Sequence, residues 1–153
     1  MRLVYLNANL IYGECLKLIT RRNIRTGVLT ALRAKGYVFI TSILTKTEIL
    51  HTLIVEKQLS ALKARIVYEC VRETFNIQQI ESLNKRNLLT NTFMDLAGVS
   101  RLDFKDALHL AIASTQKLLV VTHDKKFIKN ASTHECKQKF YSAVVKPEEL
   151  LKA

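Results

Sequence analysis

Short apolar segments that end at a polar residue alternate with helical segments along this chain, and this alternation constrains the fold more than any other feature. Residues 2–6 and 118–122 are such apolar runs, as buried parallel strands are where they reach the carboxyl edge of their sheet. Further strands are predicted at 37–40, 77–80 and 140–145, and helices at 8–20, 26–35, 42–57, 61–74, 83–96, from 100 onward and from 147 onward. Strands separated by one or two helices indicate a parallel sheet covered by helices on both faces. The sequence therefore predicts an α/β fold of three layers with about five strands, in one domain over residues 1–153.

The chain is strongly basic, with a formal net charge of +11. A protein with this excess of positive charge is expected to meet a polyanion, usually nucleic acid or an anionic membrane surface. The alternative is a solvated basic surface that only promotes solubility. The candidate contacts to nucleic-acid phosphates lie in two separate basic clusters and are Arg21, Arg22, Arg25, Lys125 and Lys126.

Cysteine usage and hydropathy predict the compartment. Cys15, Cys70 and Cys136 are widely spaced and form no C-x-x-C pair, which argues against a zinc site or a disulfide framework and for a reducing compartment. No apolar stretch approaches the ~20 residues that a membrane-spanning helix needs. We therefore expect a cytoplasmic protein without a membrane partner. The glycine-rich phosphate-binding loops of nucleotide-cofactor folds are also missing from the sequence.

Acidic residues gather around the predicted strand 118–122. Three of the four aspartates in the chain lie there: Asp103, Asp106 and Asp124. Clustered carboxylates repel one another and raise their own pKa values, and a divalent cation removes that repulsion. Mg²⁺ and Mn²⁺ prefer such oxygen ligands, and a cation held in this way can neutralise charge that develops on a phosphate.

Each of these polar residues also has a purely structural interpretation. Asp103 falls at the third position of a helix whose capping box begins at residue 100, and Asp124 has the side chain of a turn former. Glu48 would lie on a solvated helix face, and Asn9 would cap the first helix. For His109, a packed or exposed side chain without a ligand is the simpler expectation.

The order and spacing of four short motifs resemble those of PIN-domain ribonucleases, and in particular of VapC-like toxins from toxin–antitoxin pairs. The motifs are Asn7-x-Asn9 after the first strand, the stretch 40–50 with Glu48, Asp106-Ala107-x-x-x-Ala111, and Thr122-x-Asp124 at a strand end. Each motif is short, but together they span nearly the whole chain. The chain departs from the family pattern at Asn7, where the family normally carries an aspartate.

The resemblance implies a PIN-like fold and a Mg²⁺- or Mn²⁺-dependent endoribonuclease. It also implies an RNA substrate, a homodimer and a cognate antitoxin protein as inhibitor. The metal ligands implied by the resemblance are Glu48, Asp106, Asp124 and the position of Asn7, with Asp103, Thr122 and Asn9 as accessory residues. The first predicted helix is apolar over more than one face, which predicts burial inside the domain or against a second subunit.

Asn7 weakens the expected metal site, because an amide keeps one oxygen but loses the negative charge and adds N–H donors that a cation cannot use. Two explanations remain open. Either Asn7 replaces a natural aspartate and disables a toxic nuclease, or the chain is a natural, non-catalytic PIN-like module that binds RNA or protein. The first explanation gives the sharper hypothesis, a nuclease that Asn7 has inactivated.

Overall fold

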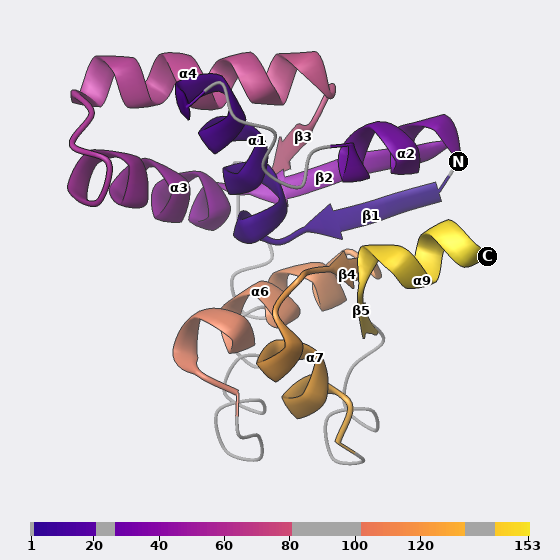
Figure 1. The fold of residues 1–153 in the computed structure, drawn as a ribbon. Coiled ribbons are helices and arrows are strands. Elements are labelled where there is room, and N and C mark those ends of the chain that lie inside the picture. The colour runs from indigo at the N-terminus through magenta and orange to yellow at the C-terminus, as the bar shows by residue number, and fades with distance from the viewer. Residues whose placement is uncertain (1, 21–26, 81–101, 134–142) are drawn as a thin grey trace.

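The structure is a computed structural model that describes residues 2–20, 27–80, 102–133 and 143–153. The predicted helix 83–96 and the first part of the predicted strand 140–145 lie outside these residues. Within them, five strands form one sheet in which every pairing is parallel (Figure 1). The strands are β1 (Arg2–Leu6), β2 (Tyr37–Ser42), β3 (Gln78–Ile80), β4 (Leu119–Val121) and β5 (Val144–Val145), in the spatial order β3-β2-β1-β4-β5. The α/β parallel fold is as predicted.

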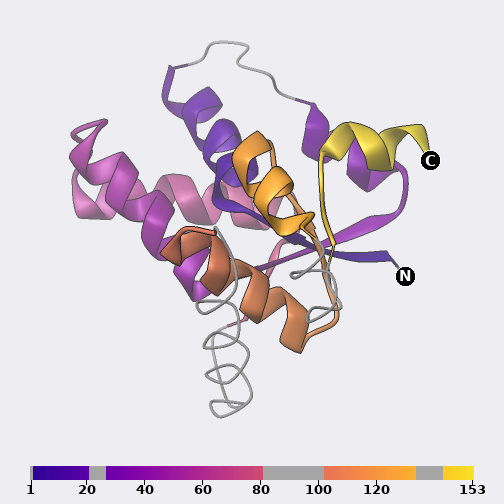
Figure 2. The same cartoon turned by 90° about the horizontal axis from the view of Figure 1, so that it is seen from below.

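Helices cover both faces of this sheet. They are α1 (Ala8–Thr20), α2 (Val28–Ala34), α3 (Ile43–Val55), α4 (Ala61–Thr74), α6 (Phe104–Thr115), α7 (Lys125–Ala131) and α9 (Pro147–Lys152). Figures 1 and 2 show α1, α3 and α4 on one face and α6 and α7 on the other. None of the described helices is long and apolar enough to cross a membrane.

The central strand β1 joins the two hydrophobic cores. Val4 and Leu6 pack with side chains of α1 to α4, whereas Tyr5 between them packs with side chains of α6 and α7. Because successive side chains of a strand point to opposite faces, this alternation buries β1 on both sides, as expected of a parallel sheet. The same alternation places Tyr5 on the face of α6.

Two helix starts differ from the sequence prediction, and both differences concern an aspartate. The helix expected from residue 100 begins at Phe104, and Asp103 precedes it as the N-cap, where its carboxylate accepts the backbone N–H of Asp106 at 2.9 Å. The helix α7 was not predicted. It begins after Asp124, whose carboxylate accepts two backbone N–H groups of its first turn. Both aspartates therefore have a capping role.

Ser42 also differs from its predicted role. The sequence predicts that its side chain caps the helix from 42 to 57, and Ser42 does stand at the N-cap position of α3, but its side chain makes no capping bond. Its hydroxyl instead lies 2.7 Å from the hydroxyl of Tyr5. The strand β2 accordingly extends two residues beyond its predicted end at residue 40 and carries Ser42 into the core.

Candidate functional site

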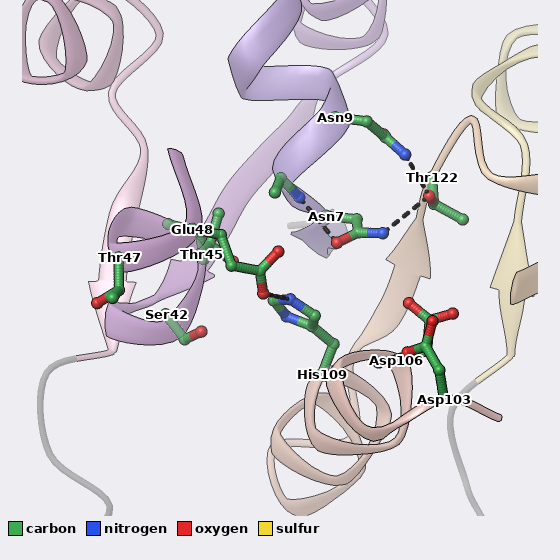
Figure 3. A network of polar contacts seen from close by, with 12 residues as sticks. Asn7, Asn9, Ser42, Thr45, Thr47, Glu48, Asp103, Asp106, His109 and Thr122 are labelled. Carbon is green, nitrogen blue, oxygen red and sulfur yellow. Dashed lines mark hydrogen bonds and ion pairs between the residues drawn. The ribbon is translucent and has the colours of Figure 1, made fainter. Parts of the chain in front are cut away.

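The candidate site lies at the carboxyl edge of the sheet, between β1 and β4. Chain connections leave β1 in one direction to β2 and β3, and the next strand, β4, returns to the opposite side of β1. Ligands of open α/β sheets bind at such a switch point. Asn7 directly follows β1 and Thr122 directly follows β4, and the backbone N–H of Asn7 donates to the carbonyl of Val121 at 3.0 Å. Figure 3 shows Glu48 of α3 and Asp106 of α6 facing the same edge.

Thr122 is the centre of the amide side of the site. Its Oγ1 accepts the side-chain N–H groups of Asn7 at 3.0 Å and of Asn9 at 2.9 Å. It also accepts the backbone N–H of Asp124 at 3.1 Å. Three donors thus converge on a hydroxyl oxygen that has only two lone pairs. Asn9 is the second residue of α1, and its Oδ1 accepts the backbone N–H of His123 at 3.2 Å, so its side chain links α1 to the end of β4 instead of capping the helix as predicted.

The orientation of the Asn7 amide follows from its second hydrogen bond. Its Oδ1 accepts the backbone N–H of Ala8 at 2.8 Å. Exchanging the oxygen and nitrogen of this amide would turn an NH₂ group toward that N–H, so the NH₂ group faces Thr122. Asn7 is buried, with 6% of its surface exposed. A carboxylate in its place would accept both the N–H of Ala8 and the hydroxyl proton of Thr122, and this would relieve the convergence of donors.

The carboxylates of the site form a concentration of negative charge around Asp106. Burial of this half-buried side chain and, to a smaller extent, the neighbouring carboxylates of Asp103, Asp124 and Glu48 together raise its pKa to about 7. The ammonium group of Lys126 acts in the opposite direction. The acids that the sequence analysis singled out are therefore brought close enough to interact.

Glu48 is held by a buried histidine. Its Oε1 lies 2.6 Å from Nε2 of His109, and Nδ1 of His109 lies 2.7 Å from the hydroxyl of Tyr5. Tyr5 in turn lies 2.7 Å from Oγ of Ser42 and 3.3 Å from Oγ1 of Thr45. We call Tyr5, His109 and Glu48 the histidine bridge. The sequence gives His109 no role in the site, and the one signal toward it is its position one turn after Asp106 on the same helix face.

The donors of the site fit a hard divalent cation in their chemistry, since all are carboxylate, amide or hydroxyl oxygens. Among the residues that the structure describes, however, no group of three His, Cys, Asp or Glu side chains is placed to hold a metal ion. The hydrogen bonds explain this arrangement. Glu48 is bound to His109, Asp103 caps α6, and Asp124 caps α7 through bonds of 3.0 and 3.1 Å. Asp103 is expected only as an accessory acid, and the two remaining expected ligands are Asp106 and the amide of Asn7.

Basic residues flank these acids. Lys125 and Lys126 are exposed in the first turn of α7, directly after Asp124. The effect of Lys126 on the pKa of Asp106 places its ammonium group near the acids. The other predicted phosphate contacts, Arg21, Arg22 and Arg25, lie outside the described residues.

A pocket of about 470 Å³ adjoins the site. It lies between α1, α3 and the start of α6, and its walls include Tyr12, Leu44 and Phe104. Asn9 and Glu48 line it as well, so the pocket opens directly beside the acids. Phe104 is 68% exposed there.

Comparison with known proteins finds similar structures but no similar sequences. No protein-family model and no curated protein sequence matches the chain. The VapBC2 complex from Rickettsia felis bound to a promoter DNA fragment matches with a TM-score of 0.62 and 16% identity, over 94% of this chain and 98% of that chain. The VapBC-1 complex from nontypeable Haemophilus influenzae matches with a TM-score of 0.63 and 12% identity, over 95% and 98%. A toxin–antitoxin complex from Klebsiella pneumoniae matches with a TM-score of 0.55 and 16% identity, over 94% and 97%.

These matches define the class of fold. The chain has a PIN-like α/β fold, with a parallel five-stranded sheet among its described residues, as the sequence motifs predict. Within that class it shares the fold found in VapBC toxin–antitoxin complexes. At identities of 12–16%, the likeness concerns the fold, and the activity has to be argued from the site.

Proposed function

We propose that the chain is a metal-dependent endoribonuclease of the VapC-like toxin type, whose metal site is impaired by Asn7. The observation that carries this proposal is the concentration of acids around Asp106, at the sheet edge where ligands bind, in a protein of net charge +11. Burial and the neighbouring carboxylates together raise the pKa of Asp106 to about 7, which costs stability that a folded domain sustains where the acids serve a ligand. A divalent cation is the ligand that offsets this charge.

Each side chain of the site has a proposed role. Glu48, Asp106 and Asp124 would hold Mg²⁺ or Mn²⁺, together with the residue at position 7. A bound cation would supply positive charge that stabilises the charge developing on the scissile phosphate. Lys125 and Lys126 would bind the neighbouring phosphates of RNA. Thr122 would orient position 7 through the bond that it now makes with the Asn7 amide.

An antitoxin protein is the proposed partner, because the matched structures are VapBC and toxin–antitoxin complexes. The pocket walled by Tyr12, Leu44 and Phe104 gives a segment of such a partner an apolar surface next to the acids.

We further propose a homodimer and a cytoplasmic location. The wide spacing of the three cysteines supports the proposal of a reducing compartment.

A non-catalytic PIN-like module is the second candidate function. Two observations favour it. The NH₂ group of Asn7 faces Thr122, and the described His, Cys, Asp and Glu side chains form no three-residue metal group. Such a module would bind RNA or a protein partner through the same basic flank and pocket, without cleavage.

The substitution Asn7→Asp separates the two functions. We expect the variant to cleave single-stranded or loop RNA when Mg²⁺ or Mn²⁺ is present and to be toxic on expression unless an antitoxin is supplied. Asn9→Asp is the matched control, because it makes the same chemical change at the other amide bound to Thr122 and should give no cleavage. Adding Asp106→Asn to Asn7→Asp should abolish the gain. RNA that stays intact with Asn7→Asp at millimolar-range metal, about the weak end of such sites, would favour the non-catalytic module.

A further inference from the structure

His109 is a polar residue in an apolar part of the molecule. It is 1% exposed, and its neighbours Leu110, Ala111 and Ile112 on α6 are all buried in the second core cluster. A buried imidazole costs free energy unless both ring nitrogens find partners. Here both do, one with Tyr5 and the other with Glu48.

The hydrogen bonds of the histidine bridge have a defined direction. An ionised Glu48 can only accept, so Nε2 of His109 must carry the proton of the 2.6 Å bond. Burial raises the pKa of Tyr5 to about 12, so its hydroxyl keeps its proton and can donate it to Nδ1. Ser42 and Thr45 then donate to the oxygen of Tyr5. The hydroxyl of Tyr5, both ring nitrogens of His109 and Oε1 of Glu48 therefore all have hydrogen-bond partners, and none of these bonds involves Oε2 of Glu48.

The bridge also ties together three elements that approach the site separately. Tyr5 comes from the central strand β1, Glu48 from α3 and His109 from α6. The rings of Tyr5 and His109 pack in a tilted arrangement with centroids 5.7 Å apart. Because Tyr5 is fully buried, the position of the imidazole is set by the core.

We propose that His109 is a positioning residue for Glu48: it fixes one carboxylate oxygen so that the other is presented to a divalent cation at the sheet edge. This inference rests on the proposed function, because it concerns the same metal. Partners that orient a metal-binding side chain in this way typically contribute a factor of about 10–100 to metal affinity. The bridge therefore has an effect on metal binding that is separable from its effect on folding.

The test is Mn²⁺ binding by the full chain that carries Asn7→Asp, measured by calorimetric titration and by the EPR signal of free Mn²⁺. His109→Leu keeps the volume but removes the donor, and we expect it to weaken Mn²⁺ binding by roughly 10–100-fold. His109→Gln restores a side-chain N–H, and it should recover most of the affinity. Thermal unfolding of each variant without metal reports the cost to the fold.

Tyr5→Phe gives a second, smaller perturbation, because it removes one oxygen atom and leaves the ring packing. Its matched control is Tyr68→Phe in α4, because Tyr68 is also fully buried as a residue. The hydroxyl of Tyr68 lies outside the bridge and donates to Gln79 at 2.9 Å. We expect both substitutions to lower stability, Tyr5→Phe by more because its hydroxyl has three buried partners, and only Tyr5→Phe to weaken Mn²⁺ binding. This pair decides the question even where His109→Leu does not fold.

Two results would overturn the inference in distinguishable ways. Unchanged Mn²⁺ affinity in folded His109→Leu, or equal affinities for Tyr5→Phe and Tyr68→Phe, would refute the positioning role while the metal site stands. Absence of Mn²⁺ binding by the Asn7→Asp parent itself would overturn the proposed function and this inference with it.

Discussion

The substitution Asp106→Asn is expected to stabilise the metal-free protein. Asparagine has nearly the same shape as aspartate but no charge, so it removes both the cost of burying that charge and its repulsion with the neighbouring acids. The pKa of Asp106 is raised from 3.8 to about 7. A shift of this size corresponds to an upper limit of about 4 kcal/mol, at about 1.36 kcal/mol per pH unit. Solvent screening of the half-buried side chain reduces the expected gain to about 1–2 kcal/mol.

The pH dependence of this gain has a definite sign. A carboxyl group whose pKa is raised in the folded state binds its proton more tightly there than in the unfolded chain. Between pH 3.8 and about 7, the native protein therefore loses stability from this group as pH rises. We expect the advantage of Asp106→Asn to be complete at about pH 8 and to shrink toward zero as pH falls to about 4.

Urea unfolding in the presence of a chelator, followed by circular dichroism across this pH range, measures the difference. Glu148→Gln is the control. It removes an exposed acid from the first turn of α9, where the helix dipole favours a negative charge, so stability should stay the same or fall slightly. Destabilisation by Asp106→Asn at pH 8 would refute the view that burial and the neighbouring acids disfavour the charge of Asp106.

Three further predictions concern the amide cluster, RNA and assembly. Thr122→Val leaves the buried amide of Asn7 without its acceptor, and chemical denaturation should show a loss of about 1–3 kcal/mol; an unchanged midpoint would show that the hydroxyl is dispensable. Replacing Lys125 and Lys126 by alanine should reduce the log–log salt slope of single-stranded RNA binding by roughly 1.4, and an unchanged slope would place the RNA elsewhere. Sedimentation should show a dimer at tens of micromolar, roughly the affinity range of transient interfaces, and a monomer there would contradict the proposed assembly.

The sheet and most helices could be predicted because their signals are local. The apolar run before Asn7 and the glycine after α2 mark their boundaries clearly, and Gly36 has the left-handed φ of 85° that favours glycine at a helix end. The sequence does not predict α7, because Asp124 fits a strand end or a turn former as well as a helix N-cap. The sequence from Asp124 to Ile128 is also typical of a helix start, with Asp124 as the N-cap and Phe127 and Ile128 as apolar residues of the first turn.

The candidate site was only partly accessible from the sequence. The order of the motifs along the chain predicts that Asn7, Asp106 and Asp124 lie at one edge of the sheet, because parallel strands share their carboxyl edge. The contact between Tyr5 and His109 joins residues that are 104 positions apart, and no local pattern encodes it. The orientation of the Asn7 amide was equally hidden, since it depends on hydrogen bonds to both Ala8 and Thr122.

Direct titration of Mn²⁺ into the unaltered chain and into Asn7→Asp tests the central claim most directly, because it needs neither the RNA target nor the antitoxin. The number of charged ligands sets the affinity of such oxygen sites over several orders of magnitude. We predict weak binding by the unaltered chain and binding at least about tenfold tighter by Asn7→Asp. Equal affinities in the two proteins would contradict the claim that position 7 completes a metal site.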